Sequence, residues 1–214
     1  MIEAVLFDMD GVLVDSEEFI CKAAMAYFAE NEIDVKESDF IPFIGAGEDR
    51  YIGGVAEKYN FKIDIDKAKA RTYKIYGDIV KGQLDALDGA ADFIEKCKNK
   101  GLKTALATSA DYTKMVINLE EIGLPLQTFD AVVNGLDIEH KKPAPDIYLK
   151  AAKMLGVKPE HCLVVEDAVN GVAAALAAGS RCLGITSSFS EKQLKGASWF
   201  AENLTVAPYE AISW

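Results

Sequence analysis

Two aspartates lie two positions apart at the end of an apolar segment near the start of the chain. The apolar residues 4–7 are followed directly by Asp8, Met9, Asp10 and Gly11. This pattern predicts a buried parallel strand that delivers both carboxylates to its carboxyl end, where ligand sites of open α/β sheets lie. Two carboxylates about 4 Å apart repel by roughly 4 kcal/mol at an effective dielectric of 20, so the pair should bind a hard cation or retain one proton.

The same short motif also occurs in strand-end turns and in calcium-binding loops. A calcium loop needs further oxygen ligands within a dozen residues, a closing glutamate and helices on both sides. Here an apolar strand precedes the motif and the apolar residues 12–14 follow it, so we set the calcium loop aside. The choice between a simple turn and a functional site depends on residues elsewhere in the chain.

The composition excludes several classes of function. The 214 residues are 50% hydrophobic and 27% charged, which is ordinary for a soluble globular protein. The net charge of −11 opposes binding to nucleic acid. No apolar run is long enough to span a bilayer, and no secretion signal precedes the first strand. We therefore expect a cytoplasmic monomer that binds neither nucleic acid nor membrane.

The cysteines and histidines do not form a recognisable metal site. The two histidines show no paired spacing, and the four cysteines are scattered without a Cys-X-X-Cys motif: Cys21, Cys97, Cys162 and Cys182. This pattern predicts buried free thiols in a reducing compartment and disfavours both a disulfide framework and a zinc site.

A helical segment separates the first strand from the rest of the chain. Apolar residues recur at three- and four-residue spacing over residues 17–32, 48–59 and 66–80, which predicts three helices. We expect Ser16 to cap the first of them, with Glu17 and Glu18 in its first turn.

Beyond residue 87 short apolar strands alternate with helices. The predicted strands are residues 103–107, 131–134, 162–165 and 181–185, and the predicted helices are residues 89–100, 112–122, 146–155 and 169–178. This alternation predicts an α/β fold with a doubly wound, parallel, Rossmann-like sheet between helices. The expected organisation is an α/β core, residues 1–16 and 82–214, with an all-helical cap, residues 17–81, inserted.

Polar residues at successive strand ends should meet at one edge of this sheet. Besides Asp8 and Asp10, they are Thr108, Ser109, Lys142, Glu166 and Asp167. Taken singly, a threonine after a strand is usually a helix cap, a lysine is usually solvated, and a Glu-Asp pair can complement a helix dipole. Their occurrence at successive strand ends instead favours phosphoryl transfer.

Each residue then has a predicted role. Asp8 would attack phosphorus to give an aspartyl-phosphate, and Asp10 would act as general acid and base. Mg²⁺ would be held by Asp8, the Asp10 carbonyl, Asp167 and Glu166. Thr108 would offer its hydroxyl and backbone N–H to a phosphate oxygen, with Ser109 beside it. Lys142 would screen the carboxylates and the phosphoryl group.

These residues resemble the motifs of the haloacid dehalogenase (HAD) superfamily, in its β-phosphoglucomutase-like subfamily with a helical cap. The four matching segments, in order, are residues 8–12, Thr108, residues 142–146, and Glu166-Asp167 with Gly171. The resemblance spans the whole chain. It implies an HAD fold in which Asp8 is the nucleophile, Asp10 is the acid and base, and Asp8, Asp10 and Asp167 bind magnesium.

The sequence departs from the mutases of that subfamily in the cap. Those mutases carry a histidine where this chain has Ile20 and an arginine where it has Glu48. The departures favour a phosphatase acting on a small phosphorylated metabolite, with a sugar phosphate expected, over a phosphosugar mutase. Arg50, together with Gly45 and Gly47 of the cap loop, is the expected substrate contact; the alternative for Arg50 is a surface ion pair.

Other functions fit less well. A dehalogenase would lack the second aspartate and would need no metal. A phosphonatase would use a cap lysine, and Lys22, Lys58 or Lys74 leave that alternative open. A phospho-acceptor module would carry its aspartate after a middle strand with no insertion. A silent binding module would not need all four motifs.

Overall fold

Six parallel strands form one sheet in the computed structural model, which describes residues 1–44 and 47–214. The strands are β1 (Ala4–Phe7), β2 (Lys103–Ala107), β3 (Ala131–Val133), β4 (Cys162–Glu166), β5 (Arg181–Ile185) and β6 (Trp199–Ala201), in the order β3-β2-β1-β4-β5-β6. β1 is central: Leu6 lies opposite Ala105 of β2 and Val164 of β4. The residues that follow β1 therefore emerge between the ends of β2 and β4.

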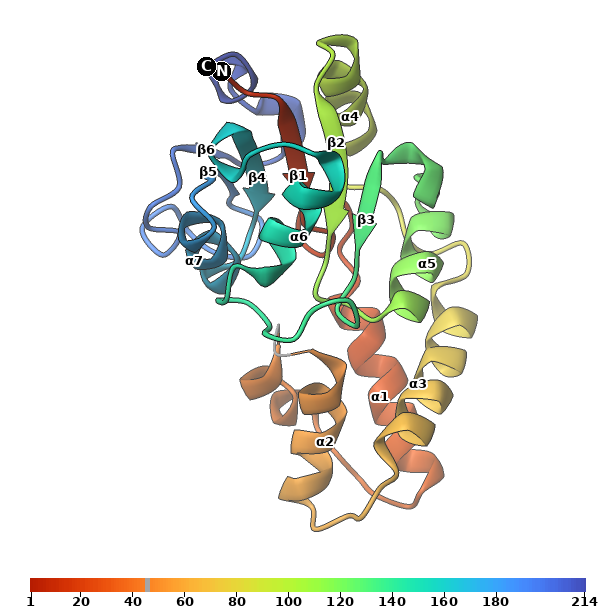
Figure 1. The fold of residues 1–214 in the computed structure, drawn as a ribbon. Coiled ribbons are helices and arrows are strands. Elements are labelled where there is room, and N and C mark those ends of the chain that lie inside the picture. The colour runs from red at the N-terminus through yellow and green to blue at the C-terminus, as the bar shows by residue number, and fades with distance from the viewer. Residues whose placement is uncertain (45–46) are drawn as a thin grey trace.

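Helices cover both faces of the sheet (Figure 1). One face packs against α6 (Asp146–Leu155) and α7 (Val169–Ala177), and the other against α4 (Ala90–Asn99) and α5 (Tyr112–Glu121). Side chains alternate between the faces of a strand, so Leu6 joins the first core and Phe7 the second. The strands are apolar on both sides because both sides are buried, and the predicted doubly wound fold is confirmed.

Between β1 and α4 the chain forms a group of helices beyond one end of the sheet (Figure 1). These are α1 (Glu17–Glu30), α2 (Glu48–Lys58) and α3 (Ile65–Val80), with short 3₁₀ turns at Glu37–Asp39 and Ile41–Phe43. Phe28 of α1 contacts Phe40 and Phe61, with ring centroids 6.2 and 6.1 Å apart, which gives this group an aromatic core of its own. These helices lie within residues 17–81, the segment expected to form an inserted cap.

The helical group is joined to the core mainly through α3 and α5. The buried hydroxyl of Tyr76 donates to the side chain of Asn118. Lys69 donates to Asp111 at 3.1 Å and also pairs with Asp49. These contacts, at Asp111 before α5 and at Asn118 within it, place α5 alongside α3.

The predicted elements have their ends within about two residues of the observed ones, but two features differ. β6 was not expected. Ser16 occupies the N-cap position of α1 without capping it, because its hydroxyl donates to Asp10 instead.

Three further observations concern the molecule as a whole. All four cysteines are buried and free, as predicted. Within residues 1–44 and 47–214, no helix combines the length and apolar character needed to cross a bilayer. The two chain ends lie side by side, with the Ile2 N–H donating to the Trp214 carbonyl at 2.9 Å, at the end of the sheet away from α1–α3 (Figure 1).

Candidate active site

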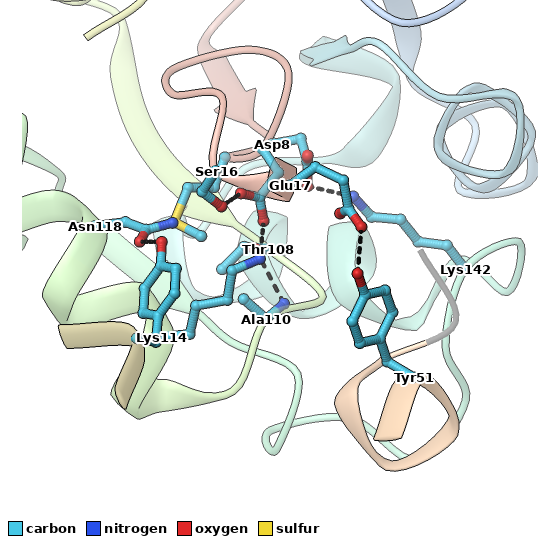
Figure 2. A network of polar contacts seen from close by, with 12 residues as sticks. Asp8, Ser16, Glu17, Tyr51, Thr108, Ala110, Lys114, Asn118 and Lys142 are labelled. Carbon is cyan, nitrogen blue, oxygen red and sulfur yellow. Dashed lines mark hydrogen bonds and ion pairs between the residues drawn. The ribbon is translucent and has the colours of Figure 1, made fainter. Parts of the chain in front are cut away.

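A tight turn after β1 positions the two aspartates. The Gly11 N–H donates to the Val14 carbonyl at 2.7 Å, and Gly11 has a φ of 76°. A Cβ at Gly11 would collide with the Asp167 carboxylate. Glycine is therefore required both for the backbone conformation and for the close approach of Asp167. The turn directs Asp8 to Lys142 and Asp10 to Lys114; Figure 2 labels Asp8 and the two lysines.

Asp8 lies against a buried lysine. The Lys142 ammonium donates to Asp8 Oδ1 and to Glu166 Oε1, both at 2.6 Å, and the lysine side chain is 7% exposed. Burial raises the pKa of Asp8 to about 7. Attraction to Lys142 lowers this pKa, and repulsion from Glu166 raises it further. Burial opposes the charge on Lys142, but attraction to Asp8 and Glu166 raises its pKa above the ordinary value, so the ammonium stays protonated.

Three carboxylates at the strand ends could hold a metal ion. Oxygens of Asp8, Glu166 and Asp167 lie within 4.8 Å of one another. Burial raises the pKa of Asp167 well above its usual range, and repulsion from Glu166 and Asp8 adds to the shift. A cluster of buried carboxylate oxygens suits a hard divalent cation such as Mg²⁺, which would remove this repulsion.

Both oxygens of Glu166, the third carboxylate of the cluster, already accept hydrogen bonds. Its Oε1 accepts from Lys142 and from Tyr148, the latter at 2.9 Å, and its Oε2 accepts from the Ala168 N–H at 2.8 Å. A Cβ at Gly171 would overlap this carboxylate, so glycine makes room for it. Asp8 and Asp167 accept fewer side-chain hydrogen bonds than Glu166 and are the better candidates for metal ligands, whereas Glu166 positions Lys142.

Asp10 has two partners of its own. It accepts from the Ser16 hydroxyl and, at 2.9 Å, from the ammonium of Lys114 on α5 (Figure 2). The Lys114 side chain is 6% exposed. Burial opposes its charge, yet attraction to Asp10 and Glu48 raises its pKa. The sequence prediction missed Lys114; the signal that could have found it is a lysine beside Met115 on the apolar side of α5.

The structure corrects the expected use of Thr108. Its backbone N–H donates to the Val133 carbonyl at 3.0 Å, so the sheet uses the donor that was expected to bind phosphate. The Thr108 hydroxyl accepts from the Ala110 N–H at 3.1 Å, which leaves the hydroxyl proton for a ligand. The neighbouring Ser109 hydroxyl is buried and finds no partner among the described residues, as expected for a group that awaits a ligand.

A cavity of about 340 Å³ joins these residues to the helical insertion. Besides all seven core residues predicted for the site, its lining includes Glu17, Ile20, Phe43, Gly47, Glu48 and Tyr51 from the insertion. Tyr51 donates to Glu17 at 2.9 Å (Figure 2). A separate surface hollow beside α4 and Tyr209 contains none of these residues. The single-sequence prediction missed Glu17, Glu48 and Tyr51 because helical periodicity does not show which polar residues face another domain.

The cap-loop predictions have mixed outcomes. Gly47 lines the cavity, whereas Gly45 lies outside the described residues. Arg50 is not part of the lining: it pairs with Glu57 at 3.1 Å, lies over the Phe43 ring at 5.4 Å and is half exposed. The structure thus brings Arg50 neither to the cavity nor to an ion pair with Glu48 or Asp49.

Comparisons with known proteins agree with this geometry. Residues 2–179 match the family model of haloacid dehalogenase-like hydrolases. The chain is 47% identical over 199 residues to the protein SUPPRESSOR OF QUENCHING 1, chloroplastic, of Arabidopsis thaliana, which covers 92% of this chain but only 19% of that protein. It is 31% identical over 190 residues to the phosphorylated carbohydrates phosphatase of Thermotoga maritima, covering 88% of both.

Among solved structures, CbbY from Rhodobacter sphaeroides in complex with xylulose-1,5-bisphosphate superimposes with a TM-score of 0.85. The two chains are 26% identical, and 96% of each is covered.

Proposed function

The chain belongs to the haloacid dehalogenase-like hydrolases and is a phosphatase; from that premise we propose that it hydrolyses a small phosphorylated metabolite through an aspartyl-phosphate on Asp8, with Mg²⁺ as cofactor. The observation that carries the proposal is Asp8 itself, buried at the floor of the cavity between Lys142 and Asp167. A sugar phosphate is the proposed substrate class, supported by relatives that are named for phosphorylated carbohydrates.

In the first step a carboxylate oxygen of Asp8 attacks phosphorus and the ester P–O bond breaks. Lys142 holds Asp8 Oδ1, so the other oxygen is the one presented for attack. Asp10 lies two residues along the turn and lines the same cavity, and it donates a proton to the departing oxygen. The products are the free alcohol and the phosphorylated Asp8.

In the second step water attacks the phosphorus of the aspartyl-phosphate. Asp10, having lost its proton, accepts one from the water, and the bond between phosphorus and the Asp8 oxygen breaks. Inorganic phosphate leaves and Asp8 is restored. The ammonium of Lys142 and the hydroxyl of Thr108 lie on the lining of the cavity where they can contact the phosphoryl oxygens in both steps.

Mg²⁺ would be held by Asp8, Asp167 and the Asp10 carbonyl, and when bound it neutralises charge on the phosphoryl oxygens. Glu166 positions Lys142 by accepting a hydrogen bond from its ammonium group.

We further propose that residues 17–81 form a cap domain over the core. The cap supplies one wall of the cavity, so it can exclude water and select the leaving group. The mutase alternative has less support, because the cavity wall carries the apolar Ile20 at the position where the related mutases have a histidine.

A phosphate-release screen tests the proposal. Phosphorylated metabolites are incubated with the protein with and without Mg²⁺, and the Asp8→Asn variant serves as the inactive control. The amide keeps the shape of the side chain but is a poor nucleophile, so turnover should fall to background while the melting temperature stays within a few degrees of wild type. More than a few per cent of residual activity would remove Asp8 from the nucleophile role.

A further inference from the structure

Glu48 is a buried carboxylate without a full set of partners. It is the first residue of α2, it lines the cavity, and it is 7% exposed. Its Oε2 has no hydrogen-bond partner among the residues that the structure describes. An unpaired buried acceptor is unfavourable, and in native proteins it usually marks a place for a water or ligand. Glu48 belongs to the part of the cavity wall that the helical insertion supplies.

The cavity has no spare positive charge. Seven acidic side chains line it, and within residues 1–44 and 47–214 the lining contains only two positively charged side chains, Lys114 and Lys142. Lys142 is bound to Asp8 and Glu166, and Lys114 to Asp10. Both lysines thus donate hydrogen bonds to core carboxylates, and Lys114 also attracts Glu48 without a hydrogen bond to it among the described residues. A second phosphate on the substrate would meet Glu17 and Glu48 on the cap side.

The amino terminus of α2 does not change this balance. A helix amino terminus is a natural place for an anion, and Gly47 at the start of α2 lines the cavity. However, Glu48 is the first residue of α2, so its own carboxyl group lies at this amino terminus. The protein thus fills this anion position with its own side chain. Burial raises the pKa of Glu48 to about 7; attraction to Lys114 opposes this shift, and repulsion from Asp111 and Asp10 adds to it.

Resting on the proposed function, we propose that the cavity selects phosphate monoesters with an uncharged, hydroxyl-bearing leaving group and rejects bisphosphates, and that Glu48 makes this choice. The Glu48 carboxylate accepts a hydroxyl of the leaving group, and its negative charge opposes a second phosphate. Ile20 and Phe43 offer apolar surface to the carbon skeleton. This inference sets the chain apart from CbbY, whose structure holds a bisphosphate.

Competition against p-nitrophenyl phosphate tests the inference. The readout is the inhibition constant of matched pairs of competitors in Mg²⁺, for example fructose 6-phosphate against fructose 1,6-bisphosphate. In the wild type the monophosphate should bind at least about tenfold more tightly than the bisphosphate. Glu48→Gln should narrow this ratio, and Glu48→Arg should narrow it further or reverse it.

A matched control uses Glu37→Gln, which removes an exposed carboxylate of the same helical group outside the cavity. It should leave the ratio unchanged. A wild type that binds the bisphosphate as well as the monophosphate, or a ratio that Glu48→Gln and Glu37→Gln change equally, overturns the inference. If Glu48→Arg does not fold, the isosteric Glu48→Gln and the wild-type ratio still decide.

A second pair separates a hydroxyl from an ammonium ligand. Glucosamine 6-phosphate should inhibit no better than glucose 6-phosphate; tighter binding of the amine that disappears in Glu48→Gln would overturn the hydroxyl assignment. The assay also separates the two proposals. Absence of Mg²⁺-dependent hydrolysis of p-nitrophenyl phosphate contradicts the proposed function, whereas normal hydrolysis with no preference for the monophosphate contradicts only the role of Glu48.

Discussion

Each of the two aspartates after β1 is held by its own buried lysine. Lys142 binds Asp8 and Lys114 binds Asp10. Two like charges this close would repel by several kcal/mol without compensation, and separate lysines supply the opposite charge to each. The two carboxylates can therefore differ in function: Asp8 belongs to the cluster of three carboxylates that could hold a metal ion, and Asp10 lines the same cavity outside that cluster.

Asp10→Asn should test the proposed role of Asp10 as general acid separately from the role of Asp8 as nucleophile. The amide cannot transfer a proton, so kcat for an alkyl phosphate should fall by about 10²–10⁴-fold. Hydrolysis of p-nitrophenyl phosphate should lose less in its first step, because p-nitrophenolate departs without a proton. Steady-state kinetics on both esters measures the difference. A loss below about tenfold on the alkyl ester would contradict general acid catalysis by Asp10.

Glu48 should make stability depend on pH. Its pKa rises from the ordinary 4.5 to about 7 on folding, chiefly through burial. Between these values the folded protein binds more protons than the unfolded chain, so the free energy of unfolding falls as pH rises from 4.5 to 7.

Glu48→Gln should then be more stable than wild type at pH 8, by at most about 3 kcal/mol, and no more stable at pH 4. Urea denaturation in metal-free buffer at both pH values measures this, with Glu37→Gln as the control. An equal difference at the two pH values would show that the effect is not ionisation of Glu48.

Thr108 shows why single residues are hard to assign from sequence. The sequence places a threonine after an apolar strand, and the observed Thr108 does line the cavity. Its backbone N–H is used by β3, however, because β2 continues its ladder one residue past its assigned end. Whether a backbone donor is free depends on the register with a neighbouring strand, and one sequence does not contain that register.

At the level of helices and strands, the spacing of apolar residues predicted nearly all elements that are long enough to show a repeating pattern. β2 and α6 have the expected bounds because the short apolar run of β2 and the 3.6-residue apolar stripe of α6 are both visible in the sequence. β6 was missed because it has three residues and two of them are only half buried. The α3–α5 contacts could not be predicted either, since Lys69 and Asp111 are ordinary surface residue types until the helices are brought together.

Arg50 on α2 should have little influence on substrate. It is half exposed and paired with Glu57 outside the cavity, and exposed ion pairs of this kind contribute about 0–1 kcal/mol. Arg50→Ala should leave KM and kcat within about twofold of wild type for any substrate that the screen identifies, a range that corresponds to a few tenths of a kcal/mol. A clear rise in KM restricted to the larger substrates would restore Arg50 as a contact for the leaving group.

At the level of the whole molecule, metal binding should couple activity to stability. Asp8 and Asp167 are forced together by folding, and a cation that binds only the folded state stabilises it by mass action. EDTA should abolish turnover, and added Mg²⁺ should restore it and raise the melting temperature with concentration. Asp167→Asn should show a smaller rise. Full activity in metal-free buffer would contradict a metal-dependent mechanism.

The oligomeric state and the cellular location of the protein remain predictions. A monomeric state and a cytoplasmic location were expected from the sequence, and the name of the Arabidopsis relative places that protein in the chloroplast. This chain matches only 19% of that protein, so what the whole Arabidopsis protein does is not carried over to this chain.

The adjacent chain ends have a consequence for engineering the molecule. Residues 2 and 214 are hydrogen-bonded at the end of the sheet opposite the cavity. A linker of a few residues could therefore join them without strain, and new ends could be opened at the exposed Lys62 between α2 and α3. Such a circular permutant would keep the core strands in one uninterrupted segment followed by β1, and would cut only the helical insertion. Its turnover would then report how far an intact cap is needed for chemistry that resides in the core.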